Sequence, residues 1–152
     1  MRLGYNNGVF NDYFKIFGIK IHPLHQENVM TKILIVDDDK QATDLLQKVL
    51  TVEGYETTAV NDSSKAVQIA DSINPHLIIL DLMMPDPDGF KVCRMLRQTP
   101  RFIFTPIIIV TALDDSDSKV VAFGAGADDY LTKPFHIDEL SQRVKDLLGR
   151  AE

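Results

Sequence analysis

The sequence is poor in cysteine, in basic residues and in long apolar runs, and each scarcity excludes a class of protein. Cys93 has no second cysteine with which to form a disulfide or a thiolate metal cluster, as is common in the reducing cytosol. The 22 acidic residues outnumber the 16 Lys and Arg, and the net charge of -6 argues against a broad surface for nucleic acid. No stretch approaches the roughly 18 apolar residues of a membrane span, and the N-terminus lacks the unbroken apolar centre of a secretory signal. We therefore expect a cytoplasmic protein that binds neither membranes nor nucleic acid directly.

The chain changes character near residue 30. Residues 1–29 mix aromatic side chains with charged and turn-forming ones, whereas Met30-Thr31-Lys32 leads directly into the first regular strand. We predict that residues 1–29 form a poorly ordered extension and that residues 30–152 form one domain with a sizeable core. An aromatic amphipathic segment that docks on the domain or on a partner is the alternative for residues 1–29, and the sequence leaves it open.

Beyond residue 32, short apolar runs alternate with segments of helical periodicity. Strands are expected at 33–36, 55–60, 77–80, 107–110 and 129–132, and helices at 40–53, 63–73, 89–97, 114–123 and 137–148. Gly149 is expected to stop the last helix. This alternation requires parallel strands, right-handed crossovers and helices on both faces of the sheet. Five units in about 120 residues favour a doubly wound, flavodoxin-like (βα)5 fold with sheet order 2-1-3-4-5 over a six-stranded Rossmann sheet.

Polar residues follow four of the predicted strands at the point where each strand ends. Asp37 and Asp38 follow the first strand and Asp81 follows the third, and these two strands are neighbours in the predicted order. Three unpaired carboxylates would repel one another, and Mg²⁺ would relieve the repulsion because it prefers oxygen ligands. Thr111 after the fourth strand and Lys133 after the fifth add a hydroxyl and an ammonium. Metal, hydrogen-bond donor and positive charge together suit a phosphoryl group.

These residues resemble the receiver domain of two-component response regulators, over about residues 31–149. The matching motifs are the acidic pair Asp37-Asp38, the strand end at Asp81, the loop residues Met84-Pro85 and Asp88-Gly89, Thr111-Ala112, and Lys133-Pro134-Phe135. The combination is far more specific than any single motif, because a lone strand-end aspartate is more often a helix N-cap or a turn residue.

The resemblance implies a role for each residue of the site. Asp81 is implied to accept a phosphoryl group from a histidine kinase or a histidine phosphotransfer protein. Mg²⁺ would be held by Asp37, Asp38, Asp81 and the backbone carbonyl of Met83. Lys133 and Thr111 would contact the phosphoryl oxygens. On these grounds the protein is expected to be a phosphoacceptor signalling domain and not an enzyme with an external substrate.

The resemblance also implies a conformational switch. Thr111 and Tyr130 are the implied switch residues, and the Lys133–Pro134 bond is similar to one that is usually cis in this family. Phosphorylation would change the surface of the fourth helix, fifth strand and last helix, which would bind a downstream effector protein. Tyr130 in plain edge-strand packing, with its hydroxyl in solvent, remains the alternative for that residue. The sequence leaves homodimerisation through charged residues of this surface open, since Glu139 and Arg143 are also placed to pair with each other.

Two departures from the family pattern affect the expected kinetics. Met83 and Leu113, two residues past Asp81 and Thr111, are apolar where the family often has polar side chains that orient the hydrolytic water. We therefore expect slow self-dephosphorylation.

Because the chain ends three residues after Gly149, we also expect a receiver without an output domain.

Two other functions compete with the receiver. Asp37-x-Asp39 after a buried strand faintly resembles the nucleophile pair of the haloacid dehalogenases, which leaves a Mg²⁺-dependent phosphohydrolase with an aspartyl-phosphate intermediate as the alternative. We instead expect Asp39 to cap the first helix. A flavin carrier on the same fold would need a Ser, Thr or Gly loop after the first strand, and the chain has none there. Cys93 is expected to fill the core and not to act in redox chemistry.

Overall fold

The computed structural model describes residues 29–151, so the expectation for residues 1–29 concerns a segment outside this range except for Val29. The elements are β1 (Lys32–Val36), α2 (Lys40–Val52), β2 (Glu56–Val60), α3 (Ala66–Ile73), β3 (Leu77–Leu80), α4 (Gly89–Gln98), β4 (Ile107–Thr111), α5 (Ser116–Gly124), β5 (Asp129–Thr132) and α6 (Ile137–Ala151). Short 3-10 turns lie at Ser63–Lys65 and Pro100–Phe102.

Within residues 29–151, the strands form one parallel sheet of order β2-β1-β3-β4-β5. This confirms the predicted flavodoxin-like topology. The aliphatic runs of β1, β3 and β4 occupy the three central positions, and nearly all of their side chains are buried. The more polar β2 lies at an edge, as its composition predicted.

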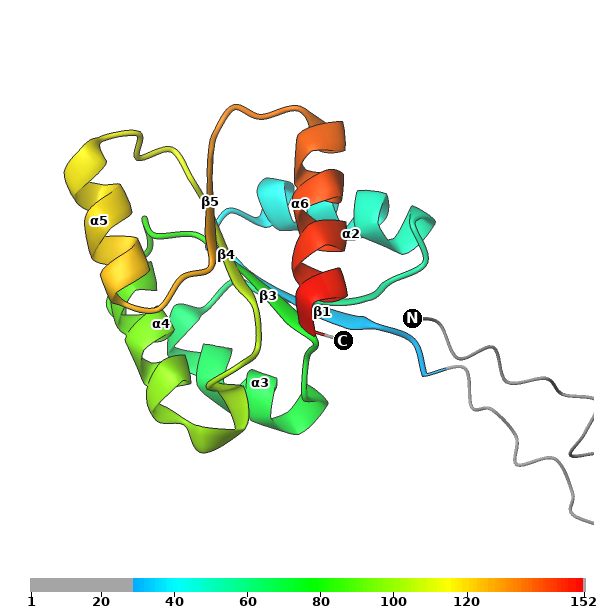
Figure 1. Ribbon diagram of the computed structural model, residues 1–152, viewed down its shortest axis with the longest axis horizontal. Coiled ribbons are helices and arrows are strands. Elements are labelled where there is room, and N and C mark those ends of the chain that lie inside the picture. The colour runs from blue at the N-terminus through cyan, green and yellow to red at the C-terminus, as the bar shows by residue number, and fades with distance from the viewer. Residues whose placement is uncertain (1–28, 152) are drawn as a thin grey trace, which may run out of the picture.

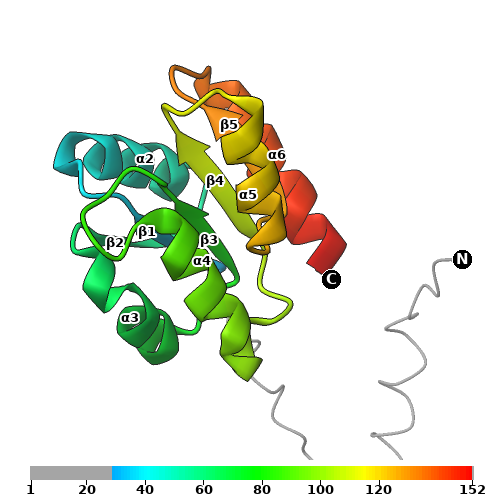
Figure 2. The ribbon, with the colours of Figure 1, turned by 90° about the vertical axis from the view of Figure 1, so that its left-hand side faces the viewer.

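The helices cover both faces of the sheet (Figure 1). Leu34 and Val36 of β1 belong to the core beneath α3, α4 and α5, whereas Ile33 and Ile35 belong to the core beneath α2 and α6. This alternation follows from the period of two residues along a strand. In the view turned by 90°, α3, α4 and α5 lie on the near side of the sheet (Figure 2).

Aspartate side chains begin three of the helices. Asp39 accepts hydrogen bonds from Gln41 and Ala42 at the start of α2, which confirms it as the N-cap. Asp88 caps α4 and Asp115 caps α5 in the same manner. Each carboxylate satisfies backbone N–H groups that have no partner within the helix and interacts favourably with the helix dipole.

The structure corrects two sequence-based expectations about the helices. Helix α5, the predicted fourth helix, begins at Ser116 and not at Asp114, because Asp115 takes the cap position. The last helix continues past Gly149 to Ala151, since a helical glycine costs only about 1 kcal/mol and Leu147 is buried just before it. In α2 the buried side chains are Thr43, Leu46 and Leu50, whereas Leu45 is 52% exposed.

Arg97 of α4 forms hydrogen bonds with the loops that precede β4 and β5, at the end of the sheet opposite the strand-end carboxylates. Its guanidinium donates hydrogen bonds to the carbonyls of Phe102 (2.6 Å) and Thr105 (2.7 Å). It also contacts the carbonyl of Gly126 (2.9 Å) and the carboxylate of Asp128 (2.8 Å). Asp128 therefore has a partner within the fold. Among residues 29–151, no helix has both the length and the hydropathy needed to cross a membrane.

Candidate functional site

Three carboxylates meet where β1 and β3 end. Val36, the last residue of β1, is paired with Leu80, the last residue of β3, so the residues that follow them emerge side by side. One carboxylate oxygen from each of Asp37, Asp38 and Asp81 lies within 4.8 Å of the other two. The structure therefore brings together the acidic residues that the sequence placed at this edge.

Asp37 is buried and extensively hydrogen-bonded. Its Oδ1 accepts a hydrogen bond from the backbone of Asp39 at 2.9 Å, and its Oδ2 accepts one from Nζ of Lys133 at 2.7 Å. Lys133 is 26% exposed, so this ion pair is only partly screened by water. The lysine reaches this position because its backbone N–H bonds to the carbonyl of Thr111 at 2.7 Å, which holds the ends of β5 and β4 together.

Asp81 and Thr111 carry polar atoms that are buried without a partner. Among the described residues, neither Oδ1 of Asp81 nor Oγ1 of Thr111 has a hydrogen-bond partner. Burial raises the pKa of the Asp81 carboxyl above its usual value, and the charge of Asp37 acts in the same direction. The Lys133 ammonium and the nearby Thr111 hydroxyl lower this pKa, although the hydroxyl does not reach hydrogen-bonding geometry with the Asp81 carboxylate. Unsatisfied buried oxygen atoms are rare in folded proteins and indicate a site prepared for a ligand.

The donor set fits a hard divalent cation. Three carboxylates with one ammonium leave an excess of negative charge, and Asp81 retains an oxygen without a hydrogen-bond donor. Carboxylate oxygens are the ligands that Mg²⁺ prefers, together with carbonyls and water. Asp37, Asp38 and Asp81 could therefore hold Mg²⁺.

The loop after Asp81 is held close to the site by backbone and side-chain contacts. The N–H groups of Met84 and Gly89 both donate to the carbonyl of Leu82, at 3.2 and 3.1 Å. The hydroxyl of Ser63 donates to the carbonyl of Pro85 at 3.1 Å. Met83, two residues beyond Asp81, has a side chain that is 54% exposed.

Tyr130 points into the protein and not into solvent. Its side chain is 8% exposed, and its hydroxyl donates to the carbonyl of Leu113 at 2.7 Å. Burial raises the pKa of this phenol, and the nearby acidic side chains add to the effect. The alternative with the hydroxyl in solvent is therefore wrong. The Lys133–Pro134 peptide bond is cis, and so is Asp86–Pro87, for which the sequence offered no signal.

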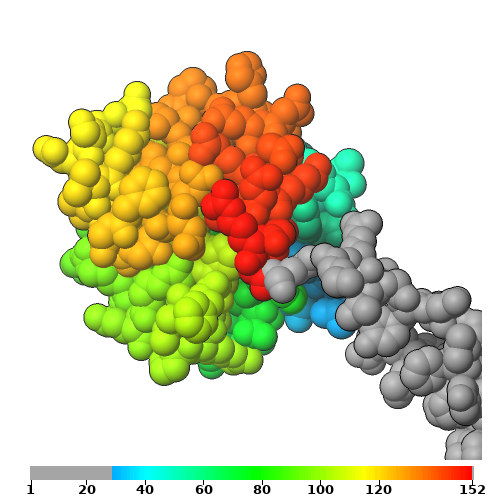
Figure 3. Space-filling model, viewed as in Figure 1, coloured from blue at the N-terminus to red at the C-terminus, as the bar shows by residue number. Residues whose placement is uncertain are grey.

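The charged residues of the α5, β5 and α6 surface pair within the chain. Arg143 bonds to Asp129 at 2.7 Å and to Glu139 at 2.8 Å, which confirms the predicted pairing of Glu139 with Arg143. Lys119 pairs with Asp114 at 2.7 Å. In the space-filling view, α5 in yellow and α6 in orange and red lie on the same face (Figure 3).

Cys93 lies in the core, as expected. Its side chain is 1% exposed, and its thiol is 3.5 Å from the carbonyl of Ala125. Burial raises the pKa of the thiol to about 11, so it stays protonated at neutral pH.

Sequence reasoning missed Asn61 and Thr43. Asn61 donates hydrogen bonds to the backbone carbonyl of Asp37 and to the hydroxyl of Thr43. Asn61 follows β2, where an asparagine is normally interpreted as a turn residue, and Thr43 lies among the apolar positions of α2. Neither position carries a sequence signal for the site, because their contacts cross between elements.

Comparisons with known proteins agree with one another. A family model described as the response regulator receiver domain matches residues 33–145. The DNA-binding dual master transcriptional regulator RpaA of Synechocystis sp. is 43% identical over 123 residues, which cover 81% of this chain and 51% of that protein. The alkaline phosphatase synthesis transcriptional regulatory protein PhoP of Bacillus subtilis is 43% identical over 121 residues, covering 80% of this chain and 50% of that protein.

Solved structures show the same likeness. A response regulator receiver domain from Francisella is 38% identical with a TM-score of 0.75, covering 80% of this chain and 99% of its own. The chemotaxis protein CheY4 of Vibrio cholerae is 28% identical with a TM-score of 0.75, covering 78% of this chain and 99% of its own. The chain spans about half the length of the curated relatives it matches.

Proposed function

Because this chain belongs to the response regulator receiver family, we propose that it is a phosphoacceptor switch whose acceptor is Asp81. The donor is the phosphohistidine of a sensor histidine kinase or of a histidine phosphotransfer protein. The observation that carries the proposal is the buried Oδ1 of Asp81, which lacks a hydrogen-bond partner among residues 29–151 and lies beside two further carboxylates.

The chemistry is a phosphoryl transfer to a carboxylate. An oxygen of Asp81 attacks phosphorus, the phosphorus–nitrogen bond of the donor breaks, and the electron pair leaves with the imidazole. Asp37, Asp38 and Asp81, together with the backbone carbonyl of Met83, would hold Mg²⁺. When bound, the cation supplies positive charge to the transferred oxygens and removes the repulsion among the carboxylates.

Lys133 and Thr111 supply the remaining contacts to the phosphoryl group. Lys133 already lies 2.7 Å from Asp37, and we expect its ammonium to bond to a phosphoryl oxygen once the acceptor is modified. The hydroxyl of Thr111 is buried, and within the described part of the chain it has no competing partner, so it is free to donate to a second oxygen.

Phosphorylation then shifts the population of two conformations. Movement of Thr111 toward the phosphoryl group changes the space beside Tyr130, whose hydroxyl now bonds to Leu113. The readout is the surface of α5, β5 and α6, on which Val120 and Phe123 of α5 are exposed. A downstream effector or a second copy of the chain would bind there. Whether the receiver acts without an output domain stays a prediction, since the relatives are about twice as long.

The competing phosphohydrolase lacks an observation that favours it. In that class a second aspartate, two residues after the nucleophile, would take part in the chemistry. Here Oδ1 of Asp39 accepts hydrogen bonds from the N–H groups of Gln41 and Ala42 as the N-cap of α2, so this carboxylate has a structural role at the start of the helix.

The test uses acetyl phosphate as the phosphoryl donor with Mg²⁺, and intact mass as the readout. We expect one phosphoryl adduct on the wild-type chain, none on Asp81→Asn, and an unchanged yield on Asp44→Asn, an exposed aspartate of α2. Absence of an adduct, an adduct that persists in Asp81→Asn, or turnover of general phosphate esters would contradict the proposal.

A further inference from the structure

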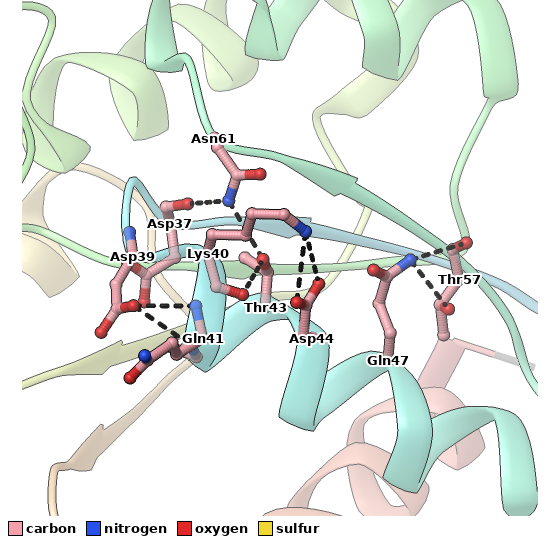
Figure 4. A network of polar contacts seen from close by, with 10 residues as sticks. Asp37, Asp39, Lys40, Gln41, Thr43, Asp44, Gln47, Thr57 and Asn61 are labelled. Carbon is pink, nitrogen blue, oxygen red and sulfur yellow. Dashed lines mark hydrogen bonds and ion pairs between the residues drawn. The ribbon is translucent and has the colours of Figure 1, made fainter.

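Asn61, at the end of β2, bonds to the loop that carries the acidic pair. Its Nδ2 donates to the backbone carbonyl of Asp37 at 2.8 Å and to Oγ1 of Thr43 at 3.0 Å. Figure 4 shows Asn61 bridging the loop and helix α2. Both N–H bonds of the side-chain amide are therefore used in one connection between the two elements.

The Asn61 contact completes the fixation of the Asp37 backbone. The N–H of Asp37 donates to the carbonyl of Val60 at 3.1 Å, and its carbonyl accepts from Asn61. Val60, the last residue of β2, and Asn61, which follows it, thus bond to both backbone polar groups of Asp37. This continues the β1–β2 pairing beyond the last residue of each strand.

Thr43 extends the connection into α2. It is 0% exposed, and its hydroxyl accepts from Asn61 while it donates to the carbonyl of Lys40 at 3.0 Å. A buried hydroxyl with both functions satisfied is well ordered. The first turn of α2 and the end of β2 are therefore fixed relative to the residues between Val36 and Lys40.

Asp38 depends on this fixation more than Asp37 does. The Asp37 carboxylate is held directly by Asp39 and Lys133, whereas no hydrogen bond to the Asp38 carboxylate occurs within residues 29–151. The side chain of Asp38 is exposed. The course of the loop backbone therefore sets where the Asp38 side chain starts, and this limits how far its carboxylate can lie from Asp81.

We propose that Asn61, supported by Thr43, is a positioning residue that presets the spacing of Asp37 and Asp38 toward Asp81 for cation binding. The inference rests on the proposed function, since it concerns the same carboxylates. Supporting contacts behind metal ligands commonly change metal affinity by about 10–100-fold. Asn61 is exposed, so water competes for its hydrogen bonds, and we expect a smaller effect of about 3–10-fold.

The first measurement is Mg²⁺ binding without phosphorylation, followed through backbone amide NMR signals of Asp38 and Asp81 during titration with MgCl₂. The sequence holds no tryptophan, so intrinsic tryptophan fluorescence has no reporter. We expect Asn61→Ala to raise the Mg²⁺ concentration for half-saturation by about 3–10-fold. Thr43→Val should shift it in the same direction, and Thr43→Ser, which keeps the hydroxyl, should restore the wild-type value.

The matched control is Gln47→Ala. Gln47 also connects α2 to β2, through contacts of 3.5 Å with Thr57, but it does not touch the acidic loop. Its removal should leave the half-saturation unchanged. In the acetyl phosphate reaction, Asn61→Ala should need more Mg²⁺ yet reach the wild-type extent of modification at saturation, which a loss of folding would not produce.

The second measurement is hydrogen exchange of the Asp38 and Asp39 amides without Mg²⁺. We expect faster exchange in Asn61→Ala than in wild type. Unchanged Mg²⁺ half-saturation in Asn61→Ala, with a responsive wild type, would overturn the positioning role alone. A wild-type chain without any Mg²⁺ response would overturn the metal part of the proposed function as well, so the two failures are distinguishable.

Discussion

Asp81 and Cys93 are both buried ionisable residues, but their surroundings give them opposite chemistry. Asp81 is 6% exposed, and the charge of Asp37 adds to the effect of burial in raising its pKa, whereas the ammonium of Lys133 lowers it. A bound cation would favour the ionised carboxylate. Cys93 lies among apolar side chains, and its pKa of about 11 keeps the thiol neutral. Burial by itself therefore does not indicate a reactive group; the neighbouring charges determine whether the buried group can ionise and react.

The thiol of Cys93 is predicted to be unreactive in the folded protein. At about pH 8 a thiol with the raised pKa is almost entirely protonated, and access is blocked because the side chain is 1% exposed. Labelling with a chromogenic disulfide reagent should be negligible in native buffer and complete after denaturation by guanidinium. Rapid labelling of the native chain would show that α4 opens readily or that the thiol is not buried.

Met83 is predicted to prolong the life of the phosphoryl group on Asp81. Its apolar side chain, 54% exposed next to the site, cannot orient a water molecule for attack. Leu113 offers no polar side chain either. We expect the wild-type adduct to decay over minutes or longer, and Met83→Asn to shorten its half-life several-fold, as followed by intact mass after removal of acetyl phosphate. Met95→Asn, a change of an exposed methionine on α4, serves as the control. Loss of the wild-type phosphoryl group within seconds would contradict the prediction.

At the scale of elements, the start of α4 depends on the absence of a side chain at Gly89. A Cβ atom there would overlap the carbonyl oxygen of Asp81 and lie 2.6 Å from Cα of Leu82. Both neighbours are backbone atoms, so they cannot rotate away. The glycine therefore allows the helix to approach the end of β3 closely, and this sets the geometry around Asp81.

Gly89→Ala is predicted to destabilise the protein by about 1–3 kcal/mol, because the overlap forces α4 or the Asp81 loop to shift. The extent of phosphorylation by acetyl phosphate should fall as well. The free energy of unfolding is measured by urea denaturation. Gly149→Ala is the control, since a Cβ there meets no atom within 4 Å and alanine favours the helix. Equal stability and equal phosphorylation of Gly89→Ala and Gly149→Ala would show that the close approach does not matter.

At the scale of the whole molecule, a single strand, β4, lies between the strand that precedes the proposed phosphoacceptor and β5 of the proposed readout surface. Asp81 follows β3, Thr111 ends β4 and Tyr130 lies in β5, and these strands are adjacent in the sheet. Tyr130 in turn packs near Phe123 of α5, with 6.4 Å between the ring centroids. These residues therefore lie on adjacent elements between the site and α5, and coupling through them requires that they have two arrangements.

Thr111→Val is predicted to weaken the conformational response to phosphorylation without lowering the free energy of unfolding. Because the described structure offers Oγ1 of Thr111 no hydrogen-bond partner, valine should leave the free energy of unfolding unchanged or raise it by up to about 1 kcal/mol. The same change removes the donor to the phosphoryl group. We expect the phosphorylated wild type to show NMR shift changes at Tyr130 and in α5, and phosphorylated Thr111→Val to show much smaller ones. Equal shift changes in both proteins would exclude the threonine from the coupling.

The sequence by itself determined the topology and the residues that meet at the carboxyl edge. Alternating aliphatic runs and helical stripes allow few arrangements of parallel strands, and parallel strands bring their ends together whatever the loops do. Asp37, Asp38 and Asp81 could for that reason be grouped without coordinates. Together with Thr111 and Lys133, those residues resemble a receiver domain, and this resemblance predicted a phosphoacceptor function.

Only the tertiary structure decided how these groups are supported. The pairing of Lys133 with Asp37, the hydrogen bond of Tyr130 to Leu113, and the Asn61 bridge all join segments far apart in the chain. Such contacts depend on the relative placement of whole elements, and local periodicity carries no information about them. Two helix ends differed for other reasons: Asp115 caps α5 through a local contact, and α6 continues past Gly149 because burial of the preceding turn outweighs the low helix preference of one glycine.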